Sequence, residues 1–236
     1  MIAAITGIGW VTTTSMGCGR DHKILTPEDG KLPKLTSRMI FGRTSSRFGR
    51  LDTYSKLGFA AITFALSEAN RVEWHEKRAI GIVASTVHGC LATDIKYYET
   101  AIPHGGALAS PNLFAYTLPN VFLGEVAIRF GLGGPSFVVH ESTLSGIAGL
   151  RMALTSLALD ECSVMLAGTC DAGCPERFPC EAEVPPGALF FVLEKTLADG
   201  VSSYGALIMN KQGEISFGGM QVQNLEALAW KCLQPA

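Results

Sequence analysis

The stretch His140-Glu141-Ser142-Thr143 is the strongest candidate for catalysis in the chain, because it places an imidazole close to two hydroxyl groups. A hydroxyl becomes a useful nucleophile only when a neighbouring base activates it. One hypothesis is therefore a minimal acyltransferase or hydrolase that uses Thr143 or Ser142 together with His140. The alternative is that Thr143 caps the start of a helix and that His140 is a buried or interface histidine.

Three of the seven cysteines, Cys170, Cys174 and Cys180, lie close together in the sequence. Zinc sites usually combine paired Cys-x2–4-Cys knuckles, so one Cys-x3-Cys pair and a single cysteine form a weak metal signal. The odd number of cysteines and the absence of a secretion signal argue against a disulfide framework. We expect free buried thiols, no metal and no cofactor. A metal- or redox-binding module built on these cysteines remains a hypothesis that metal analysis would test.

Strand-like and helix-like segments alternate through the first two thirds of the chain, which is typical of an α/β sheet with helices on its faces. We expect strands at 2–6, 79–85, 136–140 and 163–168, a closing strand pair at 189–194 and 204–209, and helices at 51–70, 90–100, 121–130 and 143–159. Gly7 and Gly9 are expected to end the first strand. Residues 12–45 predict a long loop, because they are rich in Gly, Thr, Ser, Pro and Lys.

The predicted helix at 143–159 carries a single charge, Arg151, and has apolar residues in nearly every direction. Such a helix must be buried on all sides. One sheet covers only one side of it, so either the C-terminal segment 215–236 or a partner protein must cover the rest. We therefore expect the isolated chain to be poorly soluble or to self-associate, and coexpression with its partner to rescue it.

Composition limits the classes of partner. The 236 residues are 47% hydrophobic and 17% charged, which predicts a single domain over residues 1–236 with a large protein interface. The net charge of −2 and the absence of a Lys- or Arg-rich tract give no reason to expect nucleic acid or an anionic membrane as partner. No segment has the form of a signal peptide or is long and apolar enough to span a bilayer, so we expect a cytoplasmic chain.

Several segments in series resemble the β-ketoacyl synthase branch of the thiolase superfamily. Their order and spacing agree with that family over nearly the whole chain. The matching segments are Ile5–Thr12, Arg47–Asp52, Ser110-Pro111, Leu118–Asn120, Gly124, Arg129–Pro135, Ser145-Gly146, Val164–Ala172 and Pro186–Glu194. The resemblance implies an α/β thiolase-like half, in which one mixed sheet has helices on both faces.

The sequence departs from the active members of that family in two ways. Their Ala-Cys-x-Ser-Gly motif places a thiol at a helix N-terminus, where the helix dipole helps to stabilise a thiolate. Here the aligned stretch is Glu141 to Gly146, with Thr143 at the cysteine position and Glu141 beside it, where its charge would oppose an oxyanion. Active members are also considerably longer, and none of the five histidines of this chain sits in a motif like their catalytic ones. We therefore expect no catalytic residue and no enzyme activity of the chain alone.

The family also contains catalytically silent chain-length factors, which this sequence resembles. That resemblance implies a heterodimer or higher assembly with a full-length ketosynthase, contact with acyl carrier protein through the complex, and a role in polyene-type fatty acid or polyketide pathways. A typical chain-length factor has glutamine where this chain has Thr143, so only the role carries over. For the candidate residues, ordinary helix starts and core packing remain the alternative. The implied acyl-cavity and interface candidates are His88, Leu91, Thr93, Asp94, Phe114, Tyr116, Asn120, Phe122, His140 and Thr143.

Overall fold

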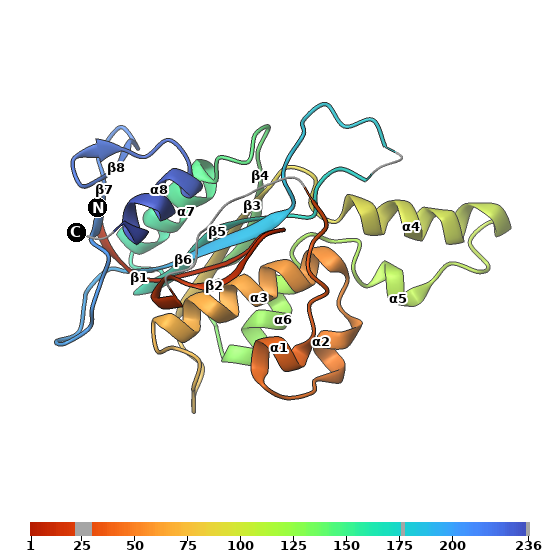
Figure 1. Cartoon of the computed structure of the whole chain (residues 1–236), viewed down its shortest axis with the longest axis horizontal. Coiled ribbons are helices and arrows are strands. Elements are labelled where there is room, and N and C mark those ends of the chain that lie inside the picture. The colour runs from red at the N-terminus through yellow and green to blue at the C-terminus, as the bar shows by residue number, and fades with distance from the viewer. Residues whose placement is uncertain (22–29, 176–177, 235–236) are drawn as a thin grey trace.

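One mixed β-sheet organises the molecule (Figure 1). The computed structural model describes residues 1–21, 30–175 and 178–234. Within them the strands run in the order β4-β3-β5-β6-β1-β7-β8-β9, and β2 pairs with β1. β3 is parallel to β4 and β5, whereas the other pairs are antiparallel. The strands are β1 Ile2–Val11, β2 Met16–Cys18, β3 Ile80–Thr86, β4 Ser136–His140, β5 Val164–Asp171, β6 Gly187–Glu194, β7 Ala206–Met209, β8 Ile215–Phe217 and β9 Met220–Gln221.

Helices cover both faces of the sheet, which confirms the predicted α/β class. α3 and α6 pack on one face, and α7 and α8 pack on the other (Figure 1). Adjacent residues of β5 alternate between the two cores, with Leu166 facing α3 and Ala167 facing α7, as the period of two in a strand requires. The helices are η1 Gly19–Asp21, α1 Ser37–Phe41, α2 Ser46–Arg50, α3 Thr53–Glu68, α4 Leu91–Ala101, η2 Ile102–His104, α5 Pro111–Phe114, α6 Val121–Phe130, α7 Ile147–Ala158 and α8 Leu225–Leu233.

The first strand is longer than predicted, because its glycines have a packing role. Gly7 and Gly9 lie inside β1, at the place where the backbone of α3 crosses the strand. A Cβ atom on Gly9 would lie 2.2 Å from the carbonyl oxygen of Ala61, and one on Gly7 would lie 2.3 Å from that of Ala65. The expectation that these glycines end the strand was wrong; they allow a helix and a strand to approach closely.

One further expectation about connectivity was wrong, and the expected loop contains three short elements. β6 and β7 do not pair with each other, because the ten-residue strand β1 lies between them and pairs with both. The predicted loop at 12–45 contains β2, η1 and α1, while residues 22–29 of that segment lie outside the described residues. β2 forms because the chain turns back onto β1, a pairing that local composition does not reveal.

α7 is covered on one side by the sheet and on another by α8. Leu150, Leu154 and Leu157 of α7 belong to the same core cluster as Leu225 and Leu228 of α8, and the two helices lie side by side (Figure 1). The remaining face is exposed and carries Arg151, Met152 and the following Leu159. The C-terminal segment therefore covers one flank of α7 through α8, while the apolar side chains of Met152 and Leu159 stay exposed in the single chain.

α4, η2 and α5 form a projection that we call the α4–α5 arm, residues 91–114. The arm extends from one end of the molecule, beyond the sheet (Figure 1). No helix among the described residues is both long and apolar enough to cross a membrane.

Candidate functional site

The turn that joins β4 to α7, residues 141–146, contains the hydroxyls singled out in the sequence. α7 begins at Ile147, and Gly146 precedes it with a left-handed backbone (φ 73°). A side chain on Gly146 would also collide with Leu225, since a Cβ would lie 2.5 Å from the Cδ1 of that residue. Thr143 lies in the turn with its side chain exposed, and its carbonyl accepts a hydrogen bond from the backbone of Ser145 (2.8 Å). The helix therefore starts four residues later than predicted, and Thr143 does not cap it.

The carboxylate of Glu141 caps α7 instead. It accepts hydrogen bonds from two hydroxyl groups and from three backbone N–H groups at the start of the helix. The donors are Ser85 Oγ (2.6 Å), Ser145 Oγ (2.7 Å), Gly146 N (3.0 Å), Ala148 N (3.1 Å) and Gly149 N (3.4 Å). The free N–H groups and the dipole of a helix make its N-terminus a favourable place for an anion. In this chain that place is filled by the protein's own carboxylate.

The proposed Thr–His or Ser–His pair is not assembled. His140 ends β4, and His140, Ser142 and Thr143 are all exposed. Across the described parts of the chain, no hydrogen bond joins the ring of His140 to either hydroxyl. A small cavity of about 120 Å³ beside the turn is lined by Leu144 and Glu226, among others. Ligand pockets start at roughly 300 Å³, so this cavity is too small for a typical organic ligand.

The turn that leads into α4 is held by a buried carboxylate. Asp171, at the end of β5, is fully buried, and its Oδ2 atom accepts from Thr86 Oγ1 (3.0 Å), Val87 N (2.9 Å) and His88 N (2.8 Å). Its Oδ1 atom accepts from Gly173 N (2.9 Å). The turn that leads into α4 is thereby anchored to the strand that follows α7.

Four of the cavity and interface candidates lie along this anchored segment. The ring Nε2 of His88 donates to the carbonyl of Ala182 (3.0 Å), and Thr93 Oγ1 donates to Asp52 Oδ2 (2.6 Å). Leu91 and Asp94 are half-buried. Burial raises the pKa of Asp94 above its usual range. The structure brings these candidates together at the base of the α4–α5 arm.

Burial also decides the protonation state of the Cys90 thiol, which lies beside Asp94. Cys90 Sγ donates to both carboxylate oxygens of Asp94 at 3.6 and 3.7 Å. Burial, and then the nearby charge of Asp94, raise the pKa of Cys90 to about 12. Cys90 is therefore a protonated core thiol at neutral pH, not a substitute nucleophile.

The aromatic candidates near the arm divide between surface and core. Phe114 is 61% exposed, Asn120 is exposed and Tyr116 is half-buried. Phe122 is fully buried, with its ring centroid 5.4 Å from that of Tyr54 beneath α3. Phe122 therefore packs in the core between α3 and the sheet, as the core-packing alternative expects.

An apolar cavity opens on the α4–α5 arm. It has a volume of about 940 Å³ and is lined by residues of α4 and η2 together with Pro175 and Phe178. Tyr98 (59%), Ile102 (72%) and Phe178 (46%) line it and are strongly exposed for large apolar side chains. Large exposed apolar patches mark interaction surfaces.

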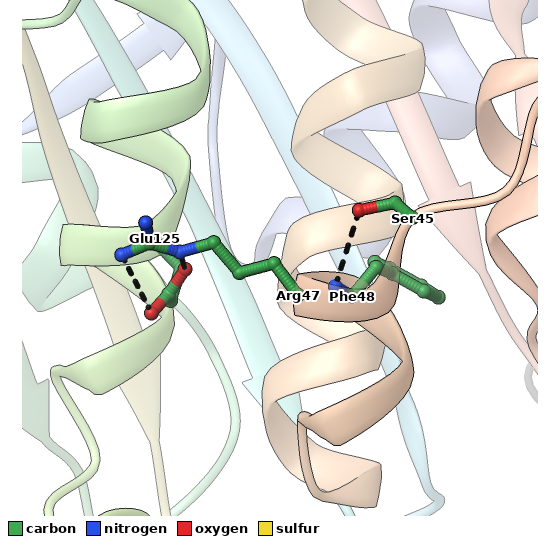
Figure 2. A network of polar contacts seen from close by, with 4 residues as sticks. All are labelled: Ser45, Arg47, Phe48 and Glu125. Carbon is green, nitrogen blue, oxygen red and sulfur yellow. Dashed lines mark hydrogen bonds and ion pairs between the residues drawn. The ribbon is translucent and has the colours of Figure 1, made fainter.

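A polar network joins α2 to α6 and was not anticipated from the sequence (Figure 2). Arg47 extends across to Glu125 and binds both of its carboxylate oxygens, and the hydrogen bond that Arg47 donates to Glu125 raises the pKa of Arg47. Ser45 Oγ caps α2 by accepting from Phe48 N (3.4 Å). The side chain of Phe48 packs against the rings of Phe41 and Phe59. These contacts explain the Arg47-Phe48 pair of the Arg47–Asp52 segment. The arginine links α2 to α6, and the phenylalanine packs in the core.

Comparison with known proteins decides the family. The sequence profile of the β-ketoacyl synthase N-terminal domain matches residues 21–180. The chain belongs to the β-ketoacyl synthase family. The matched range includes the turn at 141–146, with Thr143 and the capping carboxylate of Glu141.

A sequence relative agrees with this assignment, and two solved structures share the fold. A putative polyketide β-ketoacyl synthase 1 from Streptomyces virginiae is 33% identical over 141 residues, which cover 56% of this chain and 33% of the relative. The ishigamide ketosynthase/chain length factor structure matches with a TM-score of 0.66 at 16% identity, covering 88% of this chain and 66% of that chain. A ketosynthase in complex with its chain length factor from Xenorhabdus doucetiae matches with a TM-score of 0.61 at 20% identity, covering 84% and 81%. The aligned part spans a third of the length of the Streptomyces relative.

Two of the three clustered cysteines of this ketosynthase-like chain pair with each other. Cys174 and Cys180 form a disulfide with a Cα–Cα separation of 6.0 Å, so the expectation that all cysteines are free was wrong. A Cα–Cα separation of this size is typical of a disulfide. Cys170 is fully buried, and its Sγ lies 3.5 Å from the carbonyl of Tyr54. The described residues contain no group of three or more metal-binding side chains.

Sequence reasoning missed the two residues that shape the site most. Glu141 was recognised as a charge beside Thr143, but not as the cap of a helix that begins six residues later. Helix-capping motifs that can be recognised in a sequence place the capping side chain within three residues of the helix start. Asp171 was part of a matching segment, yet nothing in the sequence connects it to the turn at 86–88, some eighty residues earlier in the chain.

Proposed function

We propose that the chain is a catalytically silent, chain-length-factor-like subunit. It pairs with an active β-ketoacyl-ACP synthase and helps to shape the acyl cavity of that enzyme in polyene, fatty acid or polyketide synthesis. The carboxylate of Glu141 at the start of α7 carries the proposal, because it fills the helix N-terminus that would support a reactive anion at position 143.

The chemistry of condensation explains why this observation carries weight. A ketosynthase accepts an acyl group on a nucleophile that must be at least partly ionised. An exposed Thr143 without a hydrogen-bonded base has an un-ionised hydroxyl at neutral pH. A negative charge at the helix N-terminus adds repulsion to the developing anion. A subunit of this kind acts through shape and contact, not through covalent chemistry.

Two surfaces are suited to a protein partner. β4 is an edge strand of the sheet, and its apolar residues Phe137, Val138 and Val139 are only half-buried. An open edge offers unpaired backbone groups to another strand. The α4–α5 arm adds the exposed side chains of Tyr98 and Ile102. We propose that a full-length ketosynthase covers both surfaces.

The solved relatives support the type of partner. Their names describe a ketosynthase paired with a chain length factor. By analogy, acyl carrier protein would reach this chain through the complex and not by binding it alone. The proposal places the assembly in the cytoplasm and requires no cofactor on this chain.

Copurification tests the proposal directly. The chain is coexpressed with a candidate ketosynthase, and the length of the acyl product is measured with and without it. We expect stable copurification and a change in the rate or in the product length. If the ketosynthase alone gives the same rate and the same products, the proposal fails.

A matched pair of variants locates the interface. Ile102 on the arm and Leu159 after α7 are similarly exposed, at 72% and 67%. They lie at opposite ends of the sheet, since Leu159 precedes the start of β5 and the arm follows the end of β3. Ile102→Asp should abolish copurification, whereas Leu159→Asp should leave it intact. Equal effects of both would argue against the arm as the interface.

The alternative enzyme activity is tested in the same preparation. Turnover of an acyl thioester is measured for the wild type, Thr143→Ala and His140→Ala. Unchanged background rates in all three exclude the minimal acyltransferase or hydrolase. A wild-type rate that falls in either variant would support that activity and overturn the silent-subunit proposal.

A further inference from the structure

The side chain of Glu141 is held by three separate parts of the fold. Ser85 belongs to β3, Ser145 to the turn, and the N–H groups of Ala148 and Gly149 to α7. Each of these groups donates its hydrogen to the same carboxylate. The carboxylate is therefore fixed in position, and its charge is directed at the helix start.

The turn is built so that this carboxylate reaches the helix. The left-handed backbone of Gly146, with φ 73°, closes the turn directly before α7. Leu225 of α8 packs over Gly146 and donates its backbone N–H to the carbonyl of Ser145 (2.9 Å). A serine or threonine cap would satisfy the same N–H groups without adding a full charge. Here a full negative charge has been placed two residues from position 143.

We infer that Glu141 is a positioning residue that keeps position 143 from supporting an anionic nucleophile of any kind. The inference rests on the proposed function and deepens it, because silence is then enforced by Glu141 as well as by the loss of cysteine. A thiol introduced at position 143 would find the helix N-terminus already occupied. Like charge at short range disfavours its ionised form.

The prediction concerns reactivity at position 143 and needs neither partner nor substrate. Thr143→Cys should give a thiol with an ordinary or raised pKa, despite its place before a twelve-residue helix. Adding Glu141→Gln removes the negative charge and keeps the size of the side chain. The thiolate at position 143 should then become more abundant by about tenfold at neutral pH, equivalent to a shift of about one pKa unit.

Alkylation by iodoacetamide measures this shift. The thiolate sulfur forms a bond to the methylene carbon while the carbon–iodine bond breaks and iodide leaves. Rates are followed for the full chain between about pH 6 and 10, by mass spectrometry of the peptide that contains position 143, because other thiols are present. Thr143→Cys with Glu226→Gln is the matched control, since Glu226 is an exposed acid lining the small cavity beside the turn.

The expected result is an alkylation rate near neutral pH that rises about tenfold with Glu141→Gln and stays unchanged with Glu226→Gln. The same pH profile in all three proteins would overturn the inference. If Glu141→Gln does not fold, Glu141→Ala provides the test, because it removes the charge without placing an amide NH2 group against the α7 N–H groups. A pH profile that shifts with neither substitution overturns the inference.

The outcome is separable from that of the proposed function. Failure to copurify with a ketosynthase would remove the silent-subunit role but leave the thiol pKa values as measured. Unchanged thiol pKa values alongside successful copurification would remove only the role of Glu141.

Discussion

Replacing Asp171 with alanine should be one of the most damaging single changes in this chain. Its side chain is fully buried and accepts hydrogen bonds from Thr86, Val87, His88 and Gly173. Truncation leaves these donors without a partner. The donors on Thr86 and Val87 lie in buried residues, and each buried donor left unsatisfied costs about 1–3 kcal/mol. We expect the free energy of unfolding to fall by about 3–4 kcal/mol in total.

Urea unfolding followed by circular dichroism measures this loss. Thermal unfolding measures the same loss as a change in melting temperature. A chain of this size loses about 2–4 °C per kcal/mol of unfolding free energy, so the melting temperature should fall by roughly 10 °C. Asp171→Asn keeps one acceptor and should lose about half as much. Asp199→Ala, at an exposed aspartate, is the control and should change little. A loss below about 1 kcal/mol for Asp171→Ala would refute the assignment of Asp171 as the anchor of the turn before α4.

Three further results are expected. Gly9→Ala should lower the free energy of unfolding by about 1–3 kcal/mol, because a Cβ would meet the α3 backbone. The control Gly49→Ala should not lower it, because the space around Gly49 is open. Equal losses in both variants would contradict the packing role of Gly9. The denatured chain should titrate 5 thiols before reduction and 7 after it, because Cys174 and Cys180 are bonded; 7 thiols before reduction would exclude the disulfide. Burial raises the pKa of Asp94 in the folded chain, so this group's contribution to stability is present below its unfolded pKa and is lost as pH rises through its folded pKa. Asp94→Asn should remove that loss, as measured by urea unfolding between about pH 4 and 7; an unchanged pH dependence would contradict it.

Local patterns predicted many of the elements well. The helix at 121–130 and the strand at 136–140 occur with the expected bounds. α6 ends at Gly131, which adopts a left-handed backbone with φ 64°. Such boundaries depend on a few neighbouring residues, so they can be recognised in the sequence alone.

Predictions that depended on distant contacts failed for a common reason. Gly7 and Gly9 look like strand breakers until α3 is placed against β1. Cys174 and Cys180 look like free thiols until the fold places their Cα atoms 6.0 Å apart. In both cases the deciding neighbour is supplied by the folded chain and not by the adjacent sequence.

The sequence alone determined the family, the α/β class and the absence of cysteine at position 143. Those properties follow from residue types and their spacing. Only the tertiary structure decided what occupies the helix start. Glu141 reaches α7 because β3 supplies Ser85, Gly146 closes the turn and α8 holds it in place. Such an arrangement needs segments that are far apart in the chain, and their meeting is a consequence of packing that no local pattern encodes.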